Sequence, residues 1–188
     1  MTKVQAFPSL SRLLHWLMAV MIVAMLFIGI GMVTTPLHYQ ALVSIHRPLG
    51  IAVLALVALR LINRLLNPPP QLPPGMPRLI AFAAHASHVA LYALMFAVPL
   101  VGWGMLSAGG YPVVLFGAVH LPTLLPHDAP LYAALRHTHT VLALLLFAVF
   151  FAHLGAALLH AFVFRDGVFE SMAALRVSNG RPIQRRQR

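Results

Sequence analysis

Four long apolar segments run along the chain, separated by short stretches that are polar or rich in proline. They lie at about residues 11–33, 41–65, 79–106 and 131–164. A helix that crosses a bilayer needs about 20 predominantly apolar residues, so each segment predicts one span. Thr34-Thr35-Pro36 ends the first segment, and Asn67 followed by three prolines ends the second. The pattern predicts an all-α fold, an integral membrane four-helix bundle.

The link between the third and fourth segments is the longest break in this pattern. It contains Gly109-Gly110 and four prolines, so it cannot form one helix. It is nevertheless apolar around residues 113–116, and we predict that it folds back over the bundle as a cap. We expect residues 1–178 to form one domain and residues 179–188 to be a basic, disordered tail.

Composition supports a membrane location over a soluble one. Of the 188 residues, 60% are hydrophobic and 9% are charged, whereas a soluble domain carries about 25% charged residues. The net charge is +10, but the basic residues cluster at the ends of the apolar segments, which argues for a lipid bilayer as partner and against nucleic acid. The chain has no cysteine, which excludes thiolate-bound iron–sulfur clusters and haem attached through cysteine.

The arginines and lysines predict the orientation of the chain in the membrane. On one side of the predicted bundle lie Lys3, Arg12, Arg60, Arg64, Arg78, Arg165 and five arginines of the C-terminal region. On the other side lie Arg47 and Arg136. Because cytoplasmic segments of membrane proteins are enriched in Lys and Arg, we expect a multi-pass protein with both termini in the cytoplasm.

Eleven histidines are many for so apolar a chain, and four of them fall into two layers. His139 and His153 are 14 residues apart, which on one helix places them within about 40° of the same face and about 21 Å apart along the axis. By depth, His46 is level with His139 near the outer side, and His15 is level with His153 near the inner side. Both pairs therefore face the bundle interior at two depths.

Two pairs of histidines at two depths are typical of two stacked b-type haems. Each imidazole gives a neutral nitrogen to the iron, and two axial ligands leave no open position, which suits electron transfer. A histidine in a membrane span can instead form an interhelical hydrogen bond. A closed zinc site is less consistent with the pattern, because it needs four ligands at one depth.

Several histidine-containing segments form an ordered set along the chain. They are Ser11-Arg12-Leu13-Leu14-His15-Trp16, Ile45-His46-Arg47-Pro48-Leu49-Gly50 and Ala84-His85-Ala86-Ser87-His88, together with His139, His153 and His160 at spacings of 14 and 7. This set resembles the bacterial cytochrome b561 family, in particular its di-haem superoxide oxidase type. The resemblance covers about residues 9–172. It implies a four-helix bundle in the bacterial inner membrane that exchanges electrons with quinone.

The resemblance implies the ligand pairs that the depths indicate. His15 and His153 would hold the iron of the inner haem, and His46 and His139 that of the outer haem, both haems being bound without covalent attachment. His137 lies two residues before His139 and is an alternative ligand for the outer haem. The 14-residue spacing favours His139.

The residues around each haem suggest the substrates. Arg47 and Arg136 near the outer haem would attract a small anion such as superoxide, or would pair with haem propionates. At the inner end the candidates for hydrogen bonding and protonating ubiquinone, or for partnering propionates, are His160, His85, His88 and Arg78.

The leading hypothesis is an oxidoreductase that oxidises superoxide at the outer face and reduces ubiquinone. One alternative is a cytochrome b subunit that links a separate dehydrogenase or hydrogenase to the quinone pool, with a periplasmic protein as electron donor. Another, of a different class, is a haem-free transporter or channel that uses the histidines as a proton relay. The haem content of the purified protein separates the last from the others.

Overall fold

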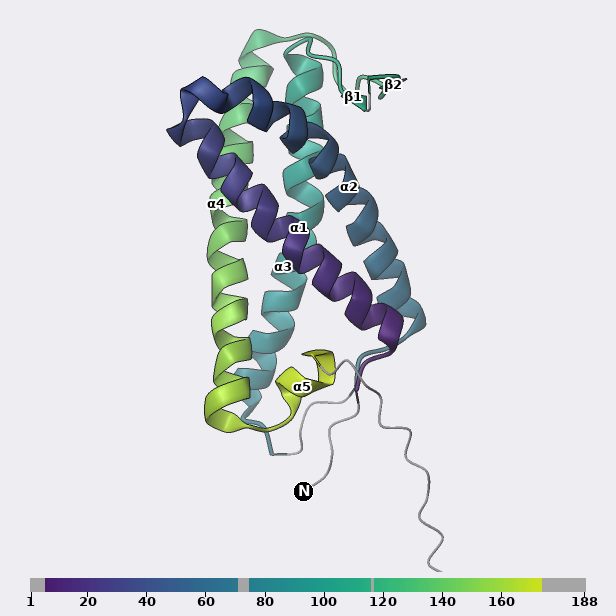
Figure 1. The fold of residues 1–188 in the computed structure, drawn as a ribbon, viewed down its shortest axis with the longest axis vertical. Helices are drawn as coiled ribbons and strands as arrows, with labels where there is room; N and C mark the ends of the chain where they lie inside the picture. The colour runs from purple at the N-terminus through teal and green to yellow at the C-terminus, as the bar shows by residue number, and fades with distance from the viewer. Residues whose placement is uncertain (1–5, 71–74, 116, 174–188) are drawn as a thin grey trace, which may run out of the picture.

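A computed structural model describes residues 6–70, 75–115 and 117–173 (Figure 1). Its four long helices are α1 (Ser9–Thr34), α2 (Tyr39–Leu66), α3 (Arg78–Ala108) and α4 (Ala129–Leu159). Each is long and apolar enough to cross a membrane. The predicted four-helix fold is therefore confirmed, and its helices lie at the apolar segments 11–33, 41–65, 79–106 and 131–164. The predicted tail at 179–188 lies outside the described residues.

Short elements join the long helices. A 3₁₀ turn, η1 (Pro36–His38), connects α1 to α2. Strands β1 (Val114–Leu115) and β2 (Val119–His120) form an antiparallel hairpin between α3 and α4. A π-helical turn, η2 (His160–Phe164), continues α4 and leads to a short helix, α5 (Val168–Ala173). We call the end of the bundle where α1 begins the α5 end, and the opposite end the hairpin end (Figure 1).

The helices pack as two antiparallel hairpins. The most extensive contacts are between α3 and α4 and between α1 and α2, and α2 joins the two hairpins through a smaller contact with α3. In the described part of the chain, neither α1 nor α2 packs extensively along α4. Figure 1 shows α1 crossing the bundle obliquely in front of the others. Side chains, and not close helix packing, therefore occupy the interior between α4 and the first hairpin, which is formed by α1 and α2.

The apolar core lies at mid-height and separates the two histidine layers. It contains buried side chains from all four long helices, including Met18 of α1, Val57 of α2, Met95 of α3 and Leu146 of α4. Leu146 lies seven residues from both His139 and His153, about 10 Å along the axis from each. Many large apolar side chains of the same helices are exposed, as expected of a surface that faces lipid.

The link between α3 and α4 packs onto these two helices, as its composition predicts. The indole Nε1 of Trp103 donates to the carbonyl of Pro122 at 3.1 Å, and the amide of Leu124 donates to Oγ of Ser107 at 3.0 Å. Val113 is buried. The strand β2, by contrast, is exposed. The link therefore covers the hairpin end of α3 and α4 and not the whole bundle.

Candidate functional site

At the hairpin end, His46 of α2 faces His139 of α4. Their ring centroids are 6.2 Å apart and their planes lie at 75° to each other. An imidazole nitrogen binds a metal ion at about 2.0 Å and lies about 1.1 Å from its ring centroid, so two imidazoles on opposite sides of one iron have centroids about 6.2–6.5 Å apart. The observed separation fits one iron between the two rings.

His139 is held in the tautomer that a metal ligand needs. Its Nδ1 lies 3.0 Å from the carbonyl oxygen of Val98 on α3. A carbonyl only accepts, so Nδ1 carries the proton and Nε2 keeps the lone pair that binds a metal. Gly102, one turn after Val98, makes this approach possible, because a Cβ there would lie 3.0 Å from Cε1 of His139.

His46 is the less constrained member of the pair. Its Nδ1 is buried and has no hydrogen-bond partner among the described residues. Gly29 of α1 lies beside this ring, and a Cβ there would be 4.0 Å from Cε1 of His46. The His46 imidazole is therefore enclosed by α1 without a polar contact that fixes its proton.

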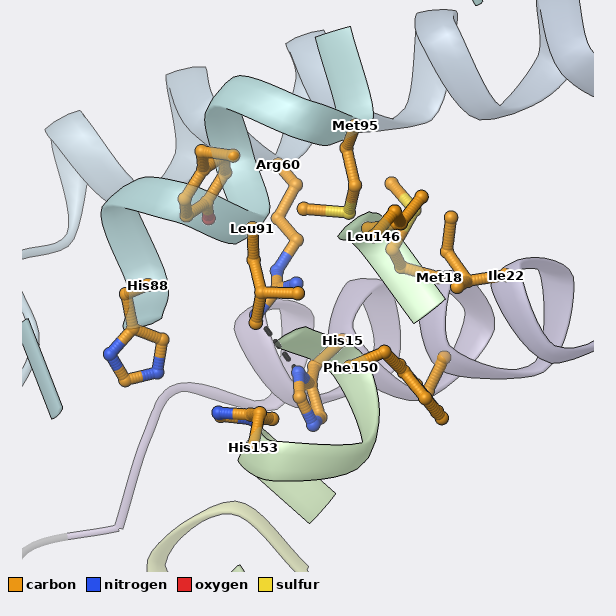
Figure 2. A pocket seen from close by; sticks show the side chains of 12 residues that line it. His15, Met18, Ile22, Arg60, His88, Leu91, Met95, Leu146, Phe150 and His153 are labelled. Atoms are coloured by element: carbon orange, nitrogen blue, oxygen red, sulfur yellow. Dashed lines mark hydrogen bonds between the residues drawn. The ribbon is translucent and has the colours of Figure 1, made fainter. Parts of the chain in front are cut away.

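At the α5 end, three histidines from three helices line one crevice. Figure 2 shows His15 of α1, His88 of α3 and His153 of α4 facing the same space, below Met18 and Leu146 of the core. The empty space in and in front of this crevice, including the part that is open to the surroundings, is about 470 Å³. The predicted pair His15 and His153 is thus brought together.

His88 is an additional imidazole beside the predicted inner pair. Its ring centroid is 5.2 Å from that of His153, which is closer than two ligands on opposite sides of one iron can be. His88 and His153 therefore do not straddle one metal ion in this arrangement. Within the described residues, no three metal-binding side chains converge closely enough to hold a bare metal ion.

Arg60 of α2 also enters the crevice. Its Nη2 lies 2.8 Å from Nδ1 of His15 (Figure 2), and its guanidinium stacks over the ring of Tyr92 at 5.5 Å. From the sequence, Arg60 was expected to indicate orientation and to anchor the inner interface, and Tyr92 was not predicted as a site residue. The available signal was the place of Arg60 inside an apolar segment, where a charged side chain is costly and usually functional.

The remaining quinone candidates do not converge with His88. His85 is exposed and its Nδ1 lies 2.8 Å from the carbonyl of Ala81, and Arg78 is exposed at the first turn of α3. His160 lies in η2, where its Nδ1 is 2.7 Å from Oδ2 of Asp166. The predicted set therefore occupies one end of the bundle without forming one cluster.

The two arginines at the hairpin end differ in environment. Arg136 is exposed on the first turns of α4 and stands free of any carboxylate among the described residues. Arg47 is partly buried, and its Nε is enclosed without a hydrogen-bond partner in the part of the chain that the structure describes. His137 is exposed, whereas His139 points inward at His46. This geometry favours His139 over His137 as the ligand.

A four-helix membrane bundle with paired histidines at two depths defines a class of membrane cytochrome. Residues 6–174 match the family described as prokaryotic cytochrome b561. The chain belongs to this family, whose members bind b-type haem and transfer electrons in membranes. The resemblance found in the sequence is thereby confirmed.

Curated relatives agree with this family. The chain is 29% identical to cytochrome b561 homolog 2 of Escherichia coli K12 over 87% of this chain and 88% of the relative. It is 32% identical to the probable superoxide oxidase CybB of Yersinia pestis over 73% of this chain and 78% of the relative. It is 26% identical to cytochrome b561 homolog 1 of Escherichia coli K12 over 85% and 92%, respectively.

Proposed function

We propose that the protein binds two b-type haems and carries electrons from superoxide at the hairpin end to ubiquinone. The observation that carries the proposal is the His46–His139 pair, with its centroid separation of 6.2 Å and the bond from His139 to Val98. Bound haem supplies a carrier that takes up and gives back one electron. The inner pair, His15 and His153, supplies the second set of ligands.

Around these ligands, the protein holds protons and excludes water. The Val98 carbonyl fixes the proton of His139 on Nδ1, which keeps Nε2 available. The core between the layers, with Met18, Val57 and Leu146, is apolar and buried. It keeps water and ions from crossing between the two ends of the bundle. The helix α4 supplies one ligand at each end.

The hairpin end is suited to an anionic electron donor. Arg136 is exposed and Arg47 lies beside His46, and this end of the described chain carries one carboxylate, Asp128. Such a local excess of positive charge raises the encounter rate of an anion. Two superoxide ions would each give up one electron and leave as dioxygen, and ubiquinone would take up two electrons and two protons. The resemblance to the probable superoxide oxidase CybB favours this donor.

The α5 end is suited to a substrate that takes up protons. His160 is held by Asp166 at 2.7 Å and is partly buried, and a histidine with a carboxylate partner can hand a proton to a bound substrate. His88 in the crevice is the second candidate. The excess of arginines at this end, with the positive-inside rule, supports a bacterial inner-membrane protein whose α5 end faces the cytoplasm.

The first test is the haem content and the superoxide activity of the purified protein. Pyridine haemochrome analysis should give two b-type haems per chain, and superoxide produced enzymatically should reduce ubiquinone in the same preparation. A colourless protein after haem-supplemented expression would refute the proposal and support the transporter alternative.

A paired variant tests the donor. Replacing Arg47 and Arg136 together with Gln should slow stopped-flow haem reduction by superoxide and weaken its dependence on ionic strength. The control is Arg165→Gln, which removes one exposed charge at the opposite end. Equal rates in the double variant and the control would rule out superoxide steering by these arginines. The haem content is measured independently and would not be affected by that outcome.

A further inference from the structure

Arg60 is a cation inside the crevice, and its present partner conflicts with the role predicted for His15. Arginine has only N–H donors, so the 2.8 Å contact requires Nδ1 of His15 to accept. A neutral histidine that accepts at Nδ1 carries its proton on Nε2. Such a ring has no lone pair left for a metal ion.

Metal binding by His15 therefore releases Arg60. When Nε2 binds the metal, the proton lies on Nδ1, where it would face the N–H of the guanidinium. The two arrangements exclude each other. Once His15 serves as a ligand, the guanidinium needs another acceptor within the reach of its side chain.

Among the described residues, no acidic side chain serves as this acceptor. The whole sequence contains three acidic residues. Asp128 caps α4 at the hairpin end, Asp166 contacts His160, and Glu170 is exposed on α5. In the described ranges none of them forms an ion pair with Arg60. An unpaired guanidinium in an apolar crevice is costly, so the acceptor should come with the ligand.

We propose that Arg60 binds a propionate carboxylate of the inner haem. This inference rests on the proposed haem binding by His15 and His153. Two arginines lie over the Tyr92 ring, Arg60 at 5.5 Å and Arg64 at 5.8 Å from its centroid. Stacking on an aromatic face fixes the plane of a guanidinium. Arg60 lines the crevice and Arg64 does not.

The test removes Arg60 and the propionate charges singly and together, and compares the rates of haem loss. Haem transfer to excess apomyoglobin is followed for the wild type, Arg60→Gln and the matched control Arg64→Gln, each loaded with haem or with haem dimethyl ester. The ester has no carboxylate charge. The kinetic phase of the inner haem is the one that His15→Ala lacks. The outer haem's phase reports that each variant is folded.

Arg60→Gln should accelerate loss of the inner haem at least tenfold, an effect typical of removing a partner next to a metal site. Arg64→Gln should behave as the wild type, and Arg60→Lys should fall between the wild type and Arg60→Gln, because it keeps the charge without the planar fork. With the dimethyl ester, Arg60→Gln and the wild type should lose the inner haem at the same rate.

Two results would overturn the assignment of Arg60. One is an inner phase in Arg60→Gln that equals that of Arg64→Gln. The other is an equal acceleration with haem and with its ester, which would mean that Arg60 acts without contacting a propionate. Either result leaves two haems bound in the wild type and so leaves the proposed function intact. A wild type without an inner phase would instead refute the proposed function itself.

Discussion

Replacing Gly102 with Ala should disturb the outer haem site while leaving the stability of the protein almost unchanged. The added Cβ would lie 3.0 Å from Cε1 and 3.2 Å from Nδ1 of His139, whereas ordinary contacts begin at 3.4 Å. The ring must therefore move away from α3 by about 0.4 Å. Val98 is on the same face of α3, one turn earlier, so its hydrogen bond to Nδ1 lengthens with this movement.

The size of the effect follows from that bond. Starting from 3.0 Å, the movement takes the Nδ1–oxygen distance to about 3.4 Å, beyond the usual range of about 2.7–3.2 Å. Losing such a bond costs about 0.5–1.5 kcal/mol, and replacing a helical Gly with Ala gains about 1 kcal/mol. The free energy of unfolding should hardly change. The binding of a metal by the released imidazole should weaken by about 10- to 100-fold.

Carbon monoxide binding to the reduced protein measures the loss of His139 as an iron ligand. An iron with both axial positions held by imidazole has no open position, so the wild type should not bind carbon monoxide, and the Gly102→Ala variant should bind it at one of two haems. The control is Gly155→Ala in α4, where a Cβ meets nothing within 4 Å. A Gly102→Ala protein as unreactive as Gly155→Ala would refute the reasoning about His139.

Three further variants test other parts of the structure. His15→Ala should lose one of the two haems, halving the reduced-minus-oxidised absorbance, whereas His38→Ala, at an exposed position, should keep both. Asp128→Ala removes the side chain that accepts from Leu131 at 2.8 Å, and thermal unfolding in detergent should show a loss of about 0.5–2 kcal/mol. Asp166→Ala removes the contacts to His160 and to the amide of Val168, so trypsin should cut after Arg165 faster than in Glu170→Ala.

The four spans could be predicted from the sequence because a bilayer demands long apolar helices. Their observed limits, such as Ser9–Thr34 for a predicted 11–33, differ by few residues since proline and polar residues end them. The hairpin of β1 and β2 and the helix α5 could not be predicted. Strands of two residues and a helix of six are too short to show a periodic pattern.

The histidine pairs were predictable for a related reason. Depth along a helix follows from residue number, and facing follows from the period, which together place His139 and His153 toward one interior. Contacts that depend on how neighbouring helices are rotated cannot be predicted from the depth of a residue or from the helical period. The bond from His139 to Val98 and the entry of Arg60 into the crevice are of this kind. Depth alone likewise grouped His85 with His88, although His85 is exposed.

The positions of the four proposed ligands would give the haems a structural role in addition to electron transfer. Each proposed pair takes one histidine from the α1–α2 hairpin and one from the α3–α4 hairpin, and these hairpins contact each other mainly through α2 and α3. An iron between His46 and His139 would tie α2 to α4, and one between His15 and His153 would tie α1 to α4. A ligand that binds only the folded state stabilises it by mass action. The two axial pairs would therefore close the side of the bundle that direct helix packing leaves open, so that losing either haem should loosen α4 from the first hairpin.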